Sequence, residues 1–413
     1  MNGSHRKHWF YGWVVLLVTC FASLTAASIT YAGSYIMTIM VLQEGLQEGV
    51  VGYATSLGYA SVALMAVPFG KLILKFGNYP MMLAGLLLQA VTLAMLIIFP
   101  ASRWMMSLSC FLSGFGTCTV VALGCPGIIK KWFKENIALP MSIVLSASSL
   151  GGFIMPPIVA SAMDGTSWRY GWAILLGITV ASAALLFFLV KEEPGEIGEV
   201  PDGHNWRRKH PETAEADKIV SSQTEKISLW KNKKLVLYGV SFMTLSALYS
   251  CIVSYISLYT IDRGFSAPQA AMVLSLVSLT GVAGKLFTTL LAKWSISGWK
   301  VTVLMFLVTG LGGAMLVFVH SFAGIVIAAI LIGFGYNCGY GTQPGVLAEW
   351  LGDGLFSAAF GLFVCFIYIG CTIGPFCMTV SGWLGGGLGE TFLMLSTVVL
   401  SAALLCFKVI PRI

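Results

Sequence analysis

A single lysine, Lys285, lies inside a long apolar stretch that runs from Gln269 to Ala292. The stretch exceeds the roughly 20 residues that a helix needs to cross a bilayer. A charge at that depth costs about 2.5–3.5 kcal/mol on insertion scales, and ionisable residues kept there usually serve function. Lys285 precedes Lys293 by eight residues, about 12 Å at 1.5 Å per residue. Its ammonium suits a small bound anion; bonding to backbone carbonyls is the structural alternative.

Polar and aromatic residues in other apolar stretches predict the rest of a pocket around Lys285. Tyr31 and Tyr35 are four residues apart and share one helix face. Tyrosine offers a hydroxyl donor to a carboxylate and a ring wall to an apolar tail. Packing between helices is the alternative for each tyrosine. The predicted substrate-binding residues are Lys285, Tyr31, Tyr35, Tyr249, Tyr336, Asn337 and Tyr340.

The charge inventory predicts the valence of that anion. Every Lys, Arg, Asp and Glu other than Lys285 can be placed in a loop or at a helix end. One cation balances a monoanion, whereas a buried dicarboxylate would keep an unpaired charge. A buried ammonium can also lose its proton. Coupled entry of proton and anion is one hypothesis, and obligate exchange of anions is the other.

Composition places the chain in a membrane. It is 57% hydrophobic and 10% charged, whereas soluble domains carry about 25% charged residues. The net charge of +7 comes from basic residues at helix ends, so we expect no nucleic-acid partner. The ten cysteines have no C-x-x-C spacing and no clustering with His. We therefore expect packing cysteines, no metal site and no cofactor.

Apolar segments recur at a spacing that predicts an all-α membrane protein with twelve transmembrane helices. The expected spans are Trp9–Tyr35, Gly49–Gly70, Tyr79–Phe99, Arg103–Ile129, Ile137–Met163, Trp168–Val190, Leu235–Ile261, Gln269–Ala292, Val301–Val319, Phe322–Leu347, Leu355–Trp383 and Thr391–Phe407.

The spans divide into two six-helix bundles, residues 1–190 and 235–413. Residues 191–234 hold nine basic and nine acidic residues, which predicts a mobile, largely unpacked linker. Only Arg103, Arg169 and Arg263 fall on the side opposite the termini. The excess of basic residues predicts cytoplasmic termini and a cytoplasmic linker. We expect a monomer in the cell (inner) membrane.

An internal repeat supports this division. The fourth span contains Gly-Phe-Gly from Gly114, and the tenth contains it from Gly333. Each also carries Pro-Gly with a tryptophan six residues beyond the proline, at Pro126 and at Pro344. Repeats of this kind are typical of transporters whose site lies between two halves.

With this pattern the chain resembles the major facilitator superfamily. The signature loop of that family, Gly-x-Leu-x-Asp-Arg-x-Gly-Arg, is matched by Gly70–Asn78, in which Gly70 and Gly77 are kept and Lys75 keeps the charge. Leu74 replaces the aspartate, which puts the usual salt bridges of the inner gate in doubt. In the second copy Lys293 keeps the charge. The resemblance implies gating roles for Gly70, Lys75, Gly77 and Lys293.

Within the superfamily, the opening Tyr11-Gly12-Trp13 resembles bacterial monocarboxylate and oxalate:formate antiporter-like carriers. Those carriers place a Gly-Arg pair where Gly284-Lys285 stands here. The second cation of the oxalate carrier is missing from Gly361–Ile369, and Gly281 stands where animal-type carriers have an aspartate. The resemblance implies a secondary carrier for a small organic monoanion, as an antiporter or a proton symporter.

Two helices combine glycine with proline, at Gly151-Gly152 with Pro156-Pro157 and at Gly370–Gly374 with Pro375. Small residues allow close helix contact and proline bends it, so we expect these surfaces to slide during gating. A proton-coupled exporter of drug-like or zwitterionic compounds and a non-transporting sensor are the alternatives. The absence of a nucleophile–base pair argues against an enzyme.

Overall fold

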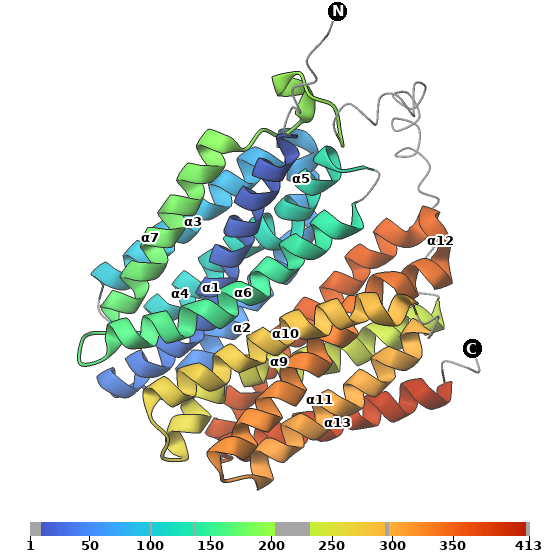
Figure 1. The fold of residues 1–413 in the computed structure, drawn as a ribbon. Coiled ribbons are helices and arrows are strands. Elements are labelled where there is room, and N and C mark those ends of the chain that lie inside the picture. Colours follow the sequence, from blue (N-terminus) through green and yellow to red (C-terminus); the bar gives the residue numbers. More distant parts are fainter. Residues whose placement is uncertain (1–9, 100, 135–136, 203–231, 294–296, 410–413) are drawn as a thin grey trace, which may run out of the picture.

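The computed structural model describes residues 10–99, 101–134, 137–202, 232–293 and 297–409 (Figure 1). Its helices are α1 (Gly12–Glu44), α2 (Gly49–Phe76), α3 (Asn78–Ile98), α4 (Arg103–Thr117), η1 (Cys118–Gly124), α5 (Cys125–Trp132), α6 (Ala138–Met163), α7 (Arg169–Leu189), η2 (Pro194–Ile197), α9 (Lys233–Asp262), α10 (Ala267–Lys293), α11 (Gly298–Phe318), α12 (Phe322–Trp383) and α13 (Leu388–Val409).

The described helices confirm the expected fold class, with 12 segments long and apolar enough to cross a membrane. The fourth span, Arg103–Trp132, consists of α4, a π-helical turn η1 and α5. The helix α12 is continuous over 62 residues and carries two spans, Phe322–Leu347 and Leu362–Trp383. The first helix continues to Glu44 instead of ending near Tyr35, because the residues that follow Tyr35 are apolar and buried.

The helices form two bundles, α1–α7 and α9–α13, that lie side by side (Figure 1). Because each bundle has six spans, α1 begins and α13 ends at the same end of the molecule, here called the termini end. The ribbons of α6 and α10 diverge toward that end in Figure 1. Toward the opposite end, Gly52 N donates to Tyr255 Oη at 2.8 Å and Thr379 Oγ1 donates to Gly49 O at 3.0 Å. The bundles are therefore closed against each other at the end away from the termini.

The Gly-Phe-Gly repeat makes equivalent contacts in the two bundles. Gly114 lies against the backbone of Gly58 in α2, and Gly116 against Gly85 in α3. In the second bundle, Gly333 lies against Val277 in α10, and Gly335 against Met305 and Thr309 in α11. A Cβ at any of these glycines would press on the neighbouring helix. The internal repeat is thus a repeated packing contact. In each bundle it packs the fourth span closely against the second and third spans.

The tryptophans of the repeat are equivalent as well. Trp132 lies 6.0 Å from the ring of Tyr11 on the first helix of its bundle. Trp350 lies 5.2 Å from the ring of Tyr238 on the first helix of the other bundle. Each ring therefore anchors the termini end of the fourth helix of its half to the first.

The segment after α7 is packed onto the first bundle, which corrects the expectation of an unpacked linker for residues 191–202. Glu192 accepts from Asn78 N and from Lys131 Nζ, both at 2.8 Å. Trp132 Nε1 donates to Lys191 O at 3.0 Å, and Glu199 accepts from Tyr11 N at 3.1 Å. Composition pointed to disorder because it counts charges and does not show which of them find partners. The remainder of the expected linker, residues 203–231, lies outside the described residues.

Glu192 also explains how the loop between α2 and α3 is held without its aspartate. Gly77 has φ 94, and its missing Cβ leaves the room that the Glu192 carboxylate occupies. Lys75 is exposed, with its Nζ 5.2 Å from the ring centroid of Phe76. The carboxylate comes from residue 192 instead of position 74, so the loop keeps an acidic partner from another part of the chain.

We predict that Glu192→Gln lowers the thermal stability of the first bundle more than Glu193→Gln does. Glu192 has 16% of its side chain exposed and bonds both a backbone N–H and Lys131, whereas Glu193 has 63% exposed. Loss of charge-assisted bonds at Glu192 costs about 1–3 kcal/mol. Thermal unfolding of the purified variants measures the difference. Equal unfolding midpoints for the two variants would show that the Glu192 contacts do not stabilise the packing of residues 191–202 on the first bundle.

Candidate functional site

The ammonium of Lys285 is bound by the opposite bundle. Its Nζ donates to Leu145 O at 3.0 Å and to Ser149 Oγ at 2.8 Å, both on α6. Among the described residues no acidic side chain is recorded as an ion-pair partner of Lys285. Of the two readings of the sequence, this conformation has the lysine bonded to a backbone carbonyl. The site of contact is nevertheless the interface between the two bundles.

Four of the five predicted tyrosines form one continuous cluster across that interface. Tyr31 Oη and Tyr249 Oη are 2.9 Å apart, which joins α1 to α9. The rings of Tyr249 and Tyr336 stack with centroids 3.7 Å apart and planes 6° apart. Tyr336 and Tyr340 follow at 6.2 Å and 27° on α12. The structure therefore brings Tyr31, Tyr249, Tyr336 and Tyr340 together.

The cluster and Lys285 share one seam between α6 and α10. Gly152 on α6 has Tyr31 and Ser278 as its nearest neighbours, and a Cβ there would lie 2.7 Å from the Tyr31 ring. Ser278 is seven residues before Lys285 on α10, which is two helical turns or about 10 Å. Ser149 is one turn from Gly152 on α6. The ammonium thus lies one to two turns nearer the termini end than Tyr31, whereas Tyr340 is close to the level of Lys285, because Gly341 lies against Thr288.

Asn337 lies beside Tyr249 of this cluster. Its Nδ2 donates to Gly333 O at 2.9 Å, and only 5% of the residue is exposed. A Cβ at Gly281 would lie 2.6 Å from that Nδ2. The amide of Asn337 therefore fills the space that a longer side chain at position 281 would need, which explains why glycine stands there.

Tyr35 is placed differently. It is 2% exposed and packs in the large apolar core. No hydrogen bond or ring contact recorded for the described residues joins it to the tyrosine cluster. Its membership of the site stays a prediction.

The expected gating residues lie in two places. Gly70, Lys75 and Gly77 belong to the end of α2, and Lys293 ends α10, with its side chain outside the described residues. Pro156 and Pro157 are inside α6, and Pro375 is inside α12 beside Gly52. Their roles in gating stay predictions.

The glycines expected to permit close contact do so. Gly151 lies against Leu24 O of α1, and Gly374 lies against Ala247 O of α9. Sequence reasoning missed Ser149 and Ser278, although two signals pointed to them. Ser149 precedes the Gly151-Gly152 pair by one turn, and Ser278 stands on the face of Lys285 at a spacing of seven.

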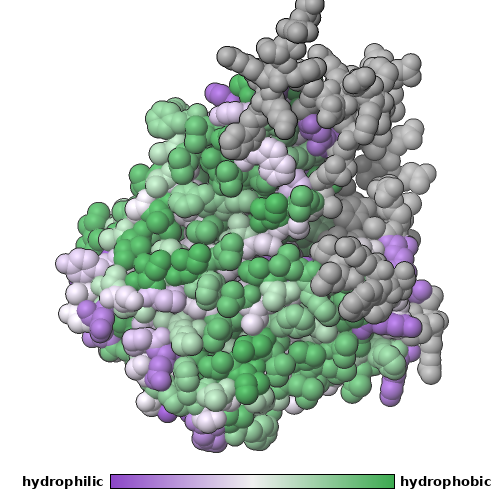
Figure 2. Space-filling view, viewed as in Figure 1, coloured by the Kyte–Doolittle hydropathy of each residue, from purple (hydrophilic) through white to green (hydrophobic). Residues whose placement is uncertain are grey.

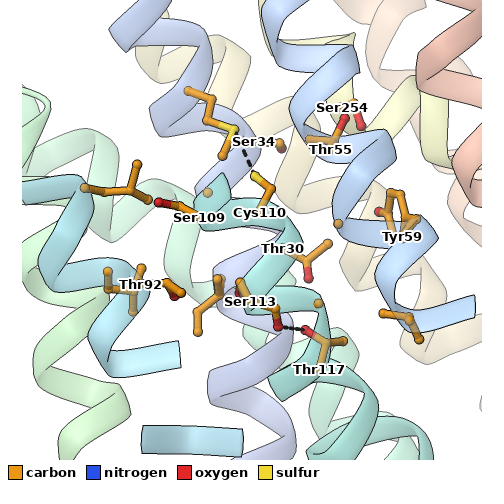
Figure 3. A pocket seen from close by; sticks show the side chains of 18 of the residues that line it. Thr30, Ser34, Thr55, Tyr59, Thr92, Ser109, Cys110, Ser113, Thr117 and Ser254 are labelled. Carbon is orange, nitrogen blue, oxygen red and sulfur yellow. Dashed lines mark hydrogen bonds between the residues drawn. The ribbon is translucent and has the colours of Figure 1, made fainter. Parts of the chain in front are cut away.

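A small pocket lies outside this seam, inside the first bundle (Figure 3). None of the predicted binding residues lines it. Its wall is built from hydroxyl-bearing and apolar side chains, so it is a separate feature of the molecule.

We predict opposite stability effects for two glycine-to-alanine changes. In Gly284→Ala the new Cβ would lie 2.7 Å from Phe334 O and 2.9 Å from Cys338 N, so α10 must move away from α12 and the melting temperature falls. In Gly177→Ala nothing lies within 4 Å, and alanine favours a helix by about 0.8–1.0 kcal/mol over glycine. Thermal unfolding measures both. A stable Gly284→Ala variant would contradict the close packing beside Lys285.

Comparison with known proteins agrees with this architecture. The model of the Major Facilitator Superfamily matches residues 15–375. Monocarboxylate transporter 12-B of Danio rerio is 26% identical over 317 residues, which cover 72% of this chain and 65% of that protein. The agnestins efflux protein AgnL12 of Paecilomyces divaricatus is 23% identical over 307 residues, 74% of this chain and 65% of that protein.

A bacterial relative, the uncharacterized MFS-type transporter YcxA of Bacillus subtilis (strain 168), is 24% identical over 210 residues, half of each chain. The matches to the first two monocarboxylate transporters span 65% and 64% of their lengths, just under two thirds. The family model, in contrast, covers most of the sequence. With its twelve spans and two bundles, this multi-pass membrane protein belongs to the Major Facilitator Superfamily.

Proposed function

We propose that the protein is a secondary carrier of a small organic monoanion, a monocarboxylate, and that Lys285 binds its carboxylate. The observation that carries the proposal is the position of the ammonium. It is the cation of the apolar seam, it bonds to neutral groups of the opposite bundle, and it has no described acidic partner. Relatives named monocarboxylate transporters support the substrate class.

The bonds of Lys285 suggest how substrate binding moves the bundles. The ammonium shares its protons with Leu145 O and Ser149 Oγ, which are neutral acceptors. A carboxylate is a stronger acceptor for a cationic donor. An arriving anion would therefore take the ammonium from α6 and release a link between the bundles. Substrate binding and rearrangement of the interface then become one event.

The tyrosine cluster supports a substrate with a flat or apolar tail. The stacked rings of Tyr249 and Tyr336 offer an apolar face, and the Tyr31 and Tyr249 hydroxyls offer polar contacts. A carboxylate at Lys285 and a tail directed toward these rings would extend along the seam between α6 and α10. A dicarboxylate has no second described cation along this seam.

The closed contacts at the end away from the termini fit one state of alternating access. With the termini in the cytoplasm, as the basic residues predict, this conformation faces inward. Lys285 is then bonded to α6 on the inner side of these closed contacts. The membrane is the cell membrane, and the protein works as a carrier and not as an enzyme.

An efflux role for drug-like compounds is the second candidate, because one relative is named an efflux protein. Such a carrier would bind neutral or cationic compounds and would not depend on a positive charge at position 285. The same binding experiment therefore separates the two functions.

We predict that monocarboxylates raise the melting temperature of the wild-type protein and that Lys285→Met removes this effect. Loss of the charge partner should weaken binding at least about 30-fold, which corresponds to about 2 kcal/mol. A thermal-shift screen of monoanions and dianions measures it. Lys300→Met, at an exposed lysine on the termini end, is the matched control. A monoanion whose effect survives in Lys285→Met would remove Lys285 from the site.

We predict that Ser149→Ala tightens substrate binding. The hydroxyl competes with the carboxylate for the ammonium, and its loss should favour substrate by about 0.5–1.5 kcal/mol, or roughly two- to tenfold. Ser142→Ala is the control, because the Ser142 hydroxyl on α6 donates to Leu139 O and touches neither Lys285 nor its acceptors. Titration of a monocarboxylate by thermal shift or calorimetry compares them. Weaker binding in Ser149→Ala would contradict the competition.

Flux into substrate-free vesicles distinguishes the two coupling modes. If proton and anion move together, an inward proton gradient accelerates uptake into empty vesicles. If the carrier is an obligate exchanger, uptake requires anion inside the vesicle and the gradient has no direct effect. Loading the vesicles with unlabelled substrate provides the second arm of the measurement.

A further inference from the structure

The pocket inside the first bundle is small and uncharged, and its largely apolar wall carries several hydroxyl groups. It has a volume of ≈ 80 Å³ (Figure 3). Four helices of the first bundle, α1 to α4, form most of its wall, and Trp172, Val253 and Ser254 complete it. None of its lining residues carries a charge. The hydroxyl groups along the wall belong to Thr30, Ser34, Thr55, Tyr59, Thr92, Ser109, Ser113, Thr117 and Ser254.

Two buried polar groups of this wall have no hydrogen-bond partner among the described residues. They are Trp172 Nε1 and Ser109 Oγ. Each of these residues is 1% exposed. Native proteins leave few buried polar groups unpaired, and an orphaned group often marks a bound water or ion. The indole N–H in particular can only donate, and it has no acceptor among the described protein atoms.

Other hydroxyls of the wall already donate hydrogen bonds to backbone carbonyls of their own helices. Thr55 donates to Val51 O at 2.8 Å, and Thr92 donates to Gln89 O at 2.8 Å. Their oxygens keep lone pairs that can accept. The residues of the wall thus include one N–H group, Trp172 Nε1, that lacks an acceptor, and several hydroxyl oxygens that can accept a hydrogen bond.

This pattern selects the ligand. An anion would find no cation, and a cation would find no carboxylate among the lining residues. A water molecule both donates and accepts, and it needs about 10–15 Å³ of such space together with 2–4 polar partners. We propose that the pocket is a hydration site that holds a small cluster of ordered waters, anchored by Trp172 Nε1 and Ser109 Oγ.

The cluster lies beside the contact that closes the bundles. Ser34 Oγ lines the pocket and donates to Val253 O of α9 at 3.0 Å. Only Val253 and Ser254 of the lining belong to the second bundle. If the proposed alternating access separates α1 from α9, these waters already solvate the polar groups that lose their partners. This role rests on the proposed function, whereas occupancy by water in the present conformation does not.

Hydroxyl-radical footprinting by X-ray radiolysis tests for the waters, because radicals form from bound water and oxidise the side chains beside it. Trp172 should react faster than Trp132, which is 0% exposed but has its Nε1 bonded to Lys191 O. Met37, which lines the pocket and is 4% exposed, should react faster than Met305, which is 6% exposed and lies elsewhere. We expect ratios of roughly threefold or more for a bound cluster. Ratios of one would overturn the proposal.

Variants connect the labelling to the pocket. Thr92→Val removes one hydroxyl of the wall at nearly constant shape, and Ser109→Ala removes one anchor. Both should slow the oxidation of Met37 relative to Met305. Thr179→Val is the matched control, because Thr179 is buried, bonds Leu175 O in its own helix and does not line the pocket. If Ser109→Ala does not fold, Thr92→Val decides alone. Equal Met37 rates in Thr92→Val and wild type would contradict the hydration site, whatever the transport assays give.

Discussion

One positive charge in an apolar interface constrains the rest of the molecule. Removal of an ammonium from water is costly unless other groups replace the solvent, and here α6 does so with a carbonyl and a hydroxyl across the boundary between the bundles. The close approach of α6 to this part of α10, and of α10 to α12 through Gly281 and Gly284, makes those bonds possible. The close packing at these glycines is therefore what brings the Lys285 ammonium within reach of its partners on α6.

The interface has two chemically distinct regions. Near the end away from the termini it is held by hydroxyls and backbone groups, such as Tyr255 with Gly52 and Ser34 with Val253. Nearer the termini end it is held by the Lys285 ammonium, which bonds to the neutral Leu145 O and Ser149 Oγ. Hydrogen bonds between neutral groups contribute modest net stability, so this seal can open without a large penalty. The ion bond can be exchanged only for another strong acceptor.

The sequence predicted the twelve spans well because transmembrane helices leave a long apolar signal that depends little on tertiary context. It also predicted that Tyr31, Tyr35, Tyr249, Tyr336 and Tyr340 belong to one site, since depth along each helix can be counted, and the structure brings all of these except Tyr35 into one cluster. It could not predict the partner of Lys285, because Ser149 is one of many serines in apolar helices and only packing selects it. The docking of Glu192 at Gly77 was hidden for a related reason, since the two residues are distant in the chain and the signature loop around Gly77 does not indicate which acidic residue packs against it.

The repeated glycine contacts also set a register between the two halves. Gly58 in α2 corresponds to Val277 in α10, because each lies against the first glycine of a Gly-Phe-Gly copy. Counting eight residues onward from each, Lys285 corresponds to Ala66. The duplicated scaffold is thus nearly symmetric in its packing and asymmetric in its charge. Under the function proposed for Lys285, a bound anion would stay attached to the second bundle while the first moves past it, so the two halves would have different mechanical roles.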